Sequence, residues 1–568
     1  MAVPVPRAVY SQARENLLRA VPPHLVCSLL CHGKECRYEG PQGWSPQQQA
    51  IRGVFSAWVT DDILAMARPT SLSIRSYQLI EQFKALNVKS LINLQLAGEH
   101  AHCGGALEQD SGFSYQPQLF MDNNIYFFNF GMPDFGVASL LRILDGVKVM
   151  AFALEQGKLA VHCHAGLGRT GVLVACYLVY AAWLSPSEAV HFVRLRRPMS
   201  IQTSSQINLV FEFGRLVTSH RAVYTRDGQP ITLQQHLDHQ RQLLHGYEAR
   251  HLKYLPKPVD FLCRRLLSLS LGRESCAVVR TEIRRAVADR RLAKQVWETL
   301  NARVGSRHTP PWAWQPVTVV LPNTTTQGQA LPNTNTNSTI GGDSLSELEL
   351  EDWISERPCS ALTLVTLTTP TQTETHLSNL AANEPIRRQV SGMSLLESVA
   401  MAMAAGPALE EELLGKVHLW QARLSEEQGA WGWLATETDP RVLSALLWSW
   451  LEHLKEPVLR SEDVVLLLSK PTAGQSLWEL EKCRDETLSC VLETLSKLSG
   501  LTSALEEAIL HRLLRAVTQC GDDDLAGLCD VKERLKVIVR EHRSHYLFPR
   551  GLVKTATLTT ITSCVNNT

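Results

Sequence analysis

The sequence carries no excess charge of either sign, because 56 Lys and Arg residues balance 56 Asp and Glu residues. Proteins that bind nucleic acid or anionic membranes usually carry a basic surface, so we expect no nucleic-acid partner. The sequence also lacks an apolar run of the ~18 residues needed to cross a bilayer. Its N-terminus has no apolar stretch behind a basic end. We therefore expect neither a membrane span nor a signal peptide, and a cytoplasmic protein.

A dense disulfide framework is missing as well. The 14 cysteines are scattered over 568 residues, and in a long chain without an export signal such thiols are usually reduced. Cys27, Cys31 and Cys36 lie near His32, which raises zinc as an alternative. Because the spacings are loose and no second cysteine pair follows nearby, the favoured interpretation is plain thiols that pack an N-terminal helix, with no metal and no cofactor.

Apolar runs and amphipathic stretches alternate in the first half of the chain. The alternation predicts an α/β fold with a mostly parallel central sheet, helices on both of its faces, and all-α regions and disordered linkers after it. The expected strands cover 88–96, 125–131 and 157–163, and the expected helices cover 138–157, 171–183 and 185–198.

Shifts in composition divide the chain further. The segment 306–392 is rich in Pro, Asn, Thr and Gly and poor in charge over much of its length, which is typical of a disordered linker. Helical periodicity precedes and follows it, and we expect Trp448 and Trp450 in the core of the later part. The expected organisation is an N-terminal helical extension (1–49), an α/β domain (50–222), a helical extension (223–305), the linker (306–392), a helical domain (393–548) and a disordered tail (549–568).

The stretch VHCHAGLGRTG combines a thiol, a guanidinium and three glycines. It follows an expected strand and leads into an expected helix, whose N-terminus favours anions. A cysteine at such a position is typically a reactive nucleophile, and Cys163 stands there. The backbone amides of the loop can curl around an anion, and Arg169 offers a planar fork to two phosphate oxygens. The expected phosphate-binding residues are His164, Ala165, Gly166, Leu167, Gly168 and Arg169.

These residues resemble the H-C-x5-R-[ST] signature of the cysteine-dependent protein tyrosine phosphatase superfamily. The resemblance implies that Cys163 attacks the phosphate of a phosphoprotein and that Arg169 binds the phosphate. Thr170 is expected to stabilise the thiolate. His162 is expected to hydrogen-bond locally and tune the thiol, not to act as a base. The remaining interpretation, a structural cysteine before a buried helix, leaves the Arg-Thr pair and the glycines unexplained.

Members of this superfamily carry an aspartate upstream of the cysteine, on a mobile loop. The segment FGMPDFGVAS provides Asp134, which we expect to act as the general acid. The alternative is a turn residue that caps the following helix, and Asp122 is a weaker candidate because it precedes a strand. A methionine, Met132, stands where the loop of the tyrosine phosphatases has tryptophan.

A second set of residues resembles the Q-T-x-x-Q element of tyrosine phosphatases. Gln202 is the expected water-positioning residue and Gln206 a supporting one. The alternative is a helix N-terminus at which both side chains are solvated. Cys103 and Cys176 are candidates for a reversible disulfide with Cys163, although Cys176 is better explained as a core residue.

The motif and the short catalytic region resemble the dual-specificity and mitotic-exit branch of the superfamily. That branch implies phosphotyrosine substrates and also phosphoserine or phosphothreonine, and an association with centrosomes or cilia. The loop has His164 and Leu167 where phosphoinositide phosphatases usually have lysines, which disfavours a lipid substrate. A phosphoinositide phosphatase and a phosphoprotein-binding scaffold of low activity remain alternatives, and the C-terminal helical domain is a candidate surface for protein partners.

Overall fold

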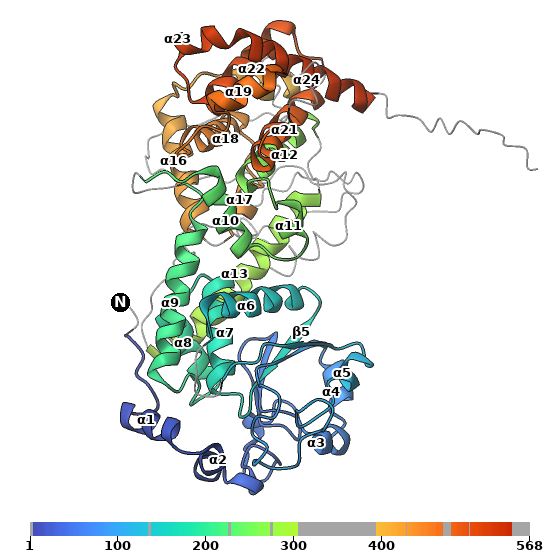
Figure 1. Ribbon diagram of the computed structural model, residues 1–568, viewed down its shortest axis with the longest axis vertical. Coiled ribbons are helices and arrows are strands. Elements are labelled where there is room, and N and C mark those ends of the chain that lie inside the picture. The colour runs from blue at the N-terminus through green and yellow to red at the C-terminus, as the bar shows by residue number, and fades with distance from the viewer. Residues whose placement is uncertain are drawn as a thin grey trace, which may run out of the picture.

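The structure is a computed structural model. It describes residues 4–133, 138–224, 229–272, 277–304, 394–427, 429–469, 477, 479–498 and 500–547. The expected linker and the expected tail lie outside these residues. Figure 1 shows an α/β part at one end and a helical part at the other, with α9 (Ser204–Arg221) and α13 (Ala277–Val304) extending between them. No helix within the described ranges is both long and apolar enough to cross a membrane.

The α/β part contains a five-stranded sheet in the order β1-β2-β5-β3-β4. All neighbouring strands are parallel except β1 and β2. The expected mostly parallel sheet is therefore confirmed. β1 and β2 were not predicted from the sequence, because they are too short to produce a clear periodicity. The strands are β1 (Ser56–Trp58), β2 (Ile63–Met66), β3 (Val88–Asn93), β4 (Tyr126–Asn129) and β5 (Lys158–His162).

Helices cover both faces of this sheet, as expected. Side chains alternate along a strand, so Ile63 and Ala65 of β2 belong to one buried cluster and Leu64 and Met66 to the other. The first cluster packs under α6–α9, and the second under α3–α5. The helices are α3 (Ser71–Ser76), α4 (Leu79–Ala85), α5 (Gln118–Met121), α6 (Leu140–Leu154), α7 (Gly168–Ala181), α8 (Pro186–Arg196) and α9.

The helix α7 begins earlier than the sequence analysis expects. Its first residue is Gly168, so Arg169 and Thr170 lie in the first helical turn. The expected N-cap of α8 is present, because Ser185 and Glu188 form a reciprocal capping box.

The helical part contains segments from both sides of the undescribed stretch. One buried cluster contains residues from Tyr224 to Leu266 and from Val399 to Val539, including Trp448 and Trp450. The structure thus packs the two helical segments around one core, where the sequence analysis treats them as two units. The helices are α10 (Leu233–Leu243), α11 (Gly246–His251), α12 (Lys257–Ser270), α13, α15 (Leu395–Ala404), α16 (Glu411–Glu426), α17 (Ala430–Leu434), α18 (Pro440–Glu452), α19 (Ser461–Ser469), α21 (Lys482–Lys497), α22 (Ser503–Thr518), α23 (Asp522–Leu525) and α24 (Cys529–Leu547), with a 3-10 turn at Ala526–Leu528.

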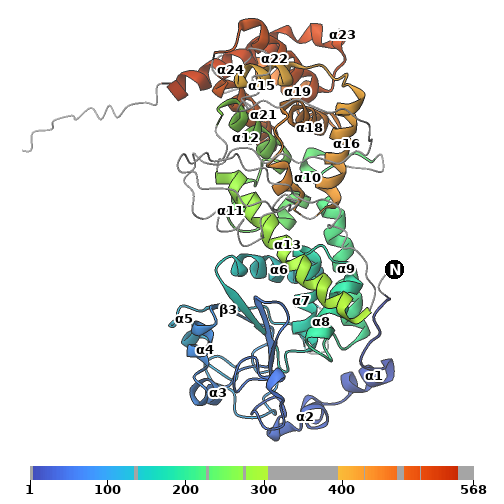
Figure 2. The same cartoon turned by 180° about the vertical axis from the view of Figure 1, so that it is seen from behind.

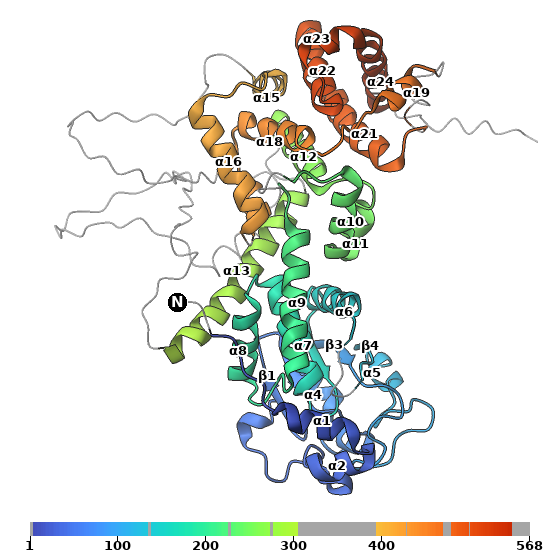
Figure 3. The same cartoon turned by 60° about the vertical axis from the view of Figure 1, so that its left-hand side comes forward.

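The N-terminal segment lies at the opposite end of the molecule from the C-terminal helices (Figures 2 and 3). It contains α1 (Gln12–Ala20) and α2 (Pro23–Cys31), followed by 3-10 turns at Gly33–Glu35 and Pro46–Gln48. Its buried hydrophobic residues form only two small clusters, one of which consists of cysteines.

Candidate active site

The candidate nucleophile lies where the central strand of the sheet ends. Cys163 follows β5 directly and is 4% exposed. The loop after Cys163 leads into α7, and the N-terminus of this helix faces the end of the loop that carries the thiol. Binding sites of parallel sheets lie at the carboxyl ends of the strands, and this loop occupies such an end. The geometry is that of an anion site with a thiol at its base.

Gly166 makes the tight curl of the loop possible. Its φ is +66°, and a Cβ at this position would lie 2.0 Å from the carbonyl oxygen of Met66 on the neighbouring strand. Any side chain would therefore be both strained and in collision with backbone.

A buried arginine that the sequence analysis missed turns the loop carbonyls away from the site. Nε of Arg197 donates to the carbonyl of Gly166 at 2.5 Å, and Nη2 donates to the carbonyl of Ala165 at 3.0 Å. Burial lowers the pKa of Arg197 to about 10, so the guanidinium stays charged at neutral pH. With these carbonyls facing Arg197, the amides of the loop are available to an anion on the other side.

Arg169 is held in place by several acceptors. Its Nη1 donates to Glu99 at 2.8 Å and to the carbonyl of Met132 at 2.8 Å, and its Nη2 also donates to Glu99. The carbonyl of Leu94, just beyond β3, accepts a further bond at 3.3 Å. A bidentate carboxylate fixes the plane of a guanidinium. Glu99 is thus a positioning residue that the sequence analysis missed, since nothing in its local sequence points to Arg169.

The expected general acid, Asp134, lies outside the described residues, which stop at Pro133 and resume at Ala138. The residues just before Asp134 lie within the described range. Met132 is buried, its amide donates to Leu94, and its carbonyl accepts from Arg169. Met132, two residues before Asp134, is thus in direct contact with Arg169.

His162 and Thr170, on either side of the loop after Cys163, differ in how their polar atoms are satisfied. His162 is fully buried, its Nε2 lies 2.7 Å from the hydroxyl of Tyr115, and its Nδ1 lies 3.0 Å from the carbonyl of Cys163. Burial lowers the pKa of His162 to about 4, so the ring is neutral at pH 7. The hydroxyl of Thr170 is buried without a hydrogen-bond partner. A buried polar group without a partner points to a ligand or a charged state of the site.

The two glutamines have different surroundings. Gln206 caps α9: its Oε1 accepts from the amides of Gln202 and Thr203, and its side chain is buried. The side chain of Gln202 is half-buried beside Gly168, and its Nε2 donates to the hydroxyl of Tyr10 at 3.2 Å. The alternative of two solvated glutamines is therefore wrong: one caps a helix, and the other lies beside the loop that follows Cys163.

The pocket above the loop is partly built by the N-terminal segment. Its lining includes Cys163, Arg169 and Gln202, and also Tyr10 and Tyr38. The sequence analysis missed this contribution, because the N-terminal segment is far from the motif in sequence and has no recognisable signal of its own.

The side chain of His164 is turned toward the N-terminal segment. It stacks on His100 with ring centroids 3.9 Å apart, and its Nε2 lies 3.5 Å from the sulfur of Cys36. Cys31 and Cys103 lie beside it. The alternative grouping of the N-terminal cysteines with His32 does not match the structure, since His32 is exposed at the end of α2.

Comparison with known proteins defines the class. A family model described as "Dual specificity phosphatase, catalytic domain" matches residues 77–215, which include the loop from Cys163 to Arg169. The chain thus contains a catalytic domain of the dual-specificity phosphatase class. A partial match to the dual specificity protein phosphatase CDC14B of Mus musculus is 32% identical and covers 29% of this chain and 32% of that protein.

Two longer relatives extend the match to almost the whole chain. The protein tyrosine phosphatase domain-containing protein 1 of Danio rerio is 33% identical and covers 94% of this chain and 93% of the relative. That of Bos taurus is 32% identical, with 92% and 87% covered. The chain belongs to the family of protein tyrosine phosphatase domain-containing protein 1.

Two solved structures are similar to part of the chain. The crystal structure of Tk-PTP in the active form has 20% identity and a TM-score of 0.24, and covers 28% of this chain and 96% of that chain. The structure of PTPMT1 has 21% identity and a TM-score of 0.25, with 30% and 99% covered.

Proposed function

We propose that the protein hydrolyses phosphotyrosine, and also phosphoserine or phosphothreonine, in phosphoproteins through a phospho-cysteine intermediate. The observation that carries the proposal is a buried thiol, Cys163, at the base of a helix N-terminus beside an arginine whose plane is set by Glu99. A thiol, inward amides and an oriented guanidinium are what phosphoryl transfer to sulfur requires.

In the first step, the thiolate of Cys163 attacks phosphorus and the bond to the ester oxygen breaks. Asp134 gives its proton to the leaving oxygen. The negative charge on the other phosphate oxygens is stabilised by the loop amides and by Arg169. Arg197 supports this step indirectly, because it binds the loop carbonyls and keeps the amides directed at the phosphate.

In the second step, water attacks the phospho-cysteine and the bond between phosphorus and sulfur breaks. Asp134, now ionised, accepts the proton of the water, and Gln202 orients the water from its position beside Gly168. The thiolate then leaves. The hydroxyl of Thr170, which has no partner in the described part of the chain, is the proposed donor to the departing sulfur.

The lining of the pocket favours an aromatic phosphoester among the substrates. Tyr10 and Tyr38 provide aromatic walls, and aromatic pairs contribute about 0.5–1.5 kcal/mol beyond simple burial. The side chain of His164, the first candidate cation of the loop, stacks on His100 instead of reaching toward additional phosphates. A phosphoprotein therefore fits better than a phosphoinositide.

A cytoplasmic location is part of the proposal. The nucleophile acts as a reduced thiolate, and the cysteines that the structure describes, Cys163 included, form no disulfide. Compartments that keep thiols reduced suit such a site.

The test compares the purified full-length protein with Cys163→Ser on an aryl phosphate and on matched phosphotyrosine and phosphoserine peptides. We expect the variant to lose at least about 10³-fold in turnover, because the nucleophile is gone. Equal rates for the two proteins would reject the proposal. A phosphoinositide hydrolysed faster than every peptide would replace the protein substrate with a lipid.

A test of the scaffold alternative has to use the full-length chain. The segments on both sides of 306–392 share one core, so a deletion after residue 305 would expose that core. Asp134→Ala keeps the thiol and the arginine but lacks the proton donor, so it is expected to retain phosphoproteins that the wild type releases. If both proteins retain the same partners whether or not these are phosphorylated, a scaffold explains the function better.

A further inference from the structure

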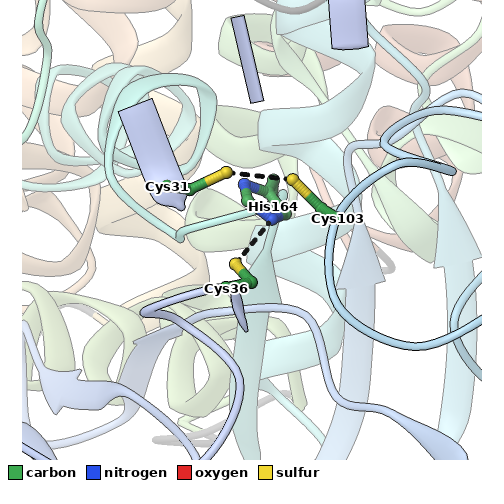
Figure 4. Close-up of side chains that lie close together, drawn as sticks. All are labelled: Cys31, Cys36, Cys103 and His164. Carbon is green, nitrogen blue, oxygen red and sulfur yellow. Dashed lines mark hydrogen bonds between the residues drawn. The ribbon is translucent and has the colours of Figure 1, made fainter. Parts of the chain in front are cut away.

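Four thiols and two imidazoles meet where the N-terminal segment contacts the catalytic loop. Figure 4 shows Cys31, Cys36, Cys103 and His164 pointing toward one another, and they come from three distant parts of the chain. Their three sulfur atoms and one ring nitrogen all lie within 4.8 Å of one another, and all four residues are buried.

The spacing of these atoms resembles that of metal ligands. With Zn–S near 2.3 Å and Zn–N near 2.0 Å, ligand atoms at the corners of a tetrahedron lie about 3.5–3.8 Å apart. The sulfur of Cys36 lies 3.5 Å from Nε2 of His164. The sulfurs of Cys31 and Cys103 are 2.9 Å apart, too far for the ~2.05 Å of a disulfide. A small rotation of one side chain brings this pair to the tetrahedral distance.

The attachment of the N-terminal segment lacks an ordinary hydrophobic core. The buried cluster at this contact consists of Cys27, Cys31, Cys36 and Cys103, with Tyr38 packed against it. Small segments that bury little apolar surface usually need a metal or a disulfide to hold their fold. The described cysteines form no disulfide, so a metal is the fitting element.

Buried polar contacts support the same cluster from outside. Arg68 donates to Glu39 at 2.7 Å and to the carbonyl of Cys103 at 2.8 Å, and its amide donates to the carbonyl of His164 at 2.9 Å. A guanidinium next to the group is favourable if the sulfurs are thiolates, because a zinc bound by three thiolates carries net negative charge.

We propose that Cys31, Cys36, Cys103 and His164 bind a structural Zn²⁺ ion. Soft thiolates with one imidazole select zinc over magnesium or calcium, and four protein ligands leave no open position for catalysis. Cys27 and His100, whose sulfur and Nδ1 are 3.4 Å apart, lie beside the site as outer partners.

The ion would join the N-terminal segment to the catalytic loop. His164 follows the nucleophile directly, while Cys31 and Cys36 belong to the segment that supplies Tyr10 and Tyr38 to the pocket. Binding of the ion does not depend on the proposed phosphatase activity, so the metal content can be measured whether or not the protein is active.

The first measurement is the zinc content of the purified full-length protein by elemental mass spectrometry. We expect about one zinc per chain, and a decrease of at least about tenfold in Cys36→Ser, since even outer partners contribute 10- to 100-fold to metal affinity. Cys529→Ser is the matched control, because that cysteine is exposed and remote from the cluster, and it should keep its zinc. A wild-type protein without zinc would overturn the proposal. So would a Cys27→Ser variant that loses the ion while Cys36→Ser keeps it.

The second measurement uses the wild type alone and does not depend on the folding of a variant. Removal of zinc with a chelator followed by addition of Co²⁺ should give the visible and charge-transfer bands of tetrahedral thiolate-bound cobalt. The bound metal should also protect the three ligand thiols, Cys31, Cys36 and Cys103, from alkylation. Absence of these bands, or a Cys31–Cys103 disulfide in the protein as isolated, would contradict a zinc site.

Discussion

The α/β part is attached to its two neighbours in different ways. The N-terminal segment contacts it through thiols, imidazoles and the buried Arg68–Glu39 pair. The helical part is joined to it by α9 and α13, and Val296 of α13 is buried in the core under the sheet. At the same junction, outside that core, Lys257 and Arg285 both form ion pairs with Glu248.

The two attachments should respond to different perturbations. Apolar packing depends on shape and volume and is indifferent to oxidation or chelation. A cluster of thiols depends on protonation, redox state and any bound ion. The N-terminal segment should therefore loosen under conditions that leave the helical part intact, and the converse should hold for core substitutions in the helical part.

The largest effect is expected from Trp448→Ala. The ring is buried in the helical core and its Nε1 donates to the carbonyl of Met403 at 3.2 Å. The cavity and the lost bond should lower the free energy of unfolding of the helical part by about 3–5 kcal/mol, measured by urea denaturation followed by tryptophan fluorescence. The loss should be the same with and without a chelator. Val465→Ala, at a side chain 66% exposed, is the control with little change.

A smaller effect is expected from Glu39→Gln, which breaks the buried pair with Arg68. The Arg68 side chain is 1% exposed and that of Glu39 13%, so an uncompensated guanidinium should destabilise the N-terminal attachment by about 2–3 kcal/mol. Hydrogen exchange should speed up in α2 while α18 keeps its rate. Glu35→Gln, at an exposed position of the same segment, should change neither. Faster exchange in both regions would mean that the two attachments are not independent.

The contrast also explains what could be predicted from the sequence. The strand before Cys163 and the helix after it follow from local patterns, and the sheet direction and its helical covering are confirmed. The phosphate loop follows from a compact motif. Glu99 and Arg197 could not be predicted, because each acts on the loop through tertiary contacts with no fixed spacing. Zinc at Cys31 and Cys36 was weighed from the sequence, but their proximity to Cys103 and His164 could not be predicted, since the four residues come from three distant segments.

A third prediction concerns pH and the junction between the α/β and helical parts. Asp289 on α13 lines a cavity there with Arg285 and Glu282. Burial, and secondarily the charge of Glu282, raises the pKa of Asp289 to about 7. The folded protein thus holds this proton more tightly than the unfolded chain, whose carboxyl titrates near 3.9. Stability from the neutral form is fully present below about pH 4 and is lost as pH rises toward 7.

Asp289→Asn should therefore remove this loss. Because the side chain keeps part of its exposure to solvent, we expect the gain of the variant over the wild type to grow from near zero at about pH 4 to about 1–2 kcal/mol at about pH 8. Thermal unfolding across that range measures the difference. Asp238→Asn, whose side chain is 50% exposed, should follow the wild type. If the stability of Asp289→Asn keeps the wild-type pH dependence, a group other than Asp289 is responsible for it.

The smallest effect tests whether the N-terminal segment contributes to chemistry as well as to the pocket wall. Tyr10→Phe keeps the aromatic ring but removes the hydroxyl that accepts from Nε2 of Gln202 at 3.2 Å. Loss of one such bond costs about 0.5–1.5 kcal/mol, or roughly twofold to tenfold in rate. If Gln202 orients the hydrolytic water, the loss should fall on hydrolysis of the phospho-cysteine.

In rapid mixing with an aryl phosphate, the burst of released phenol should stay unchanged while steady-state turnover falls. Tyr247→Phe, at a side chain 81% exposed, should change neither phase. A slower burst with unchanged later turnover would instead assign Tyr10 to substrate binding, and the N-terminal segment would then act on the pocket alone.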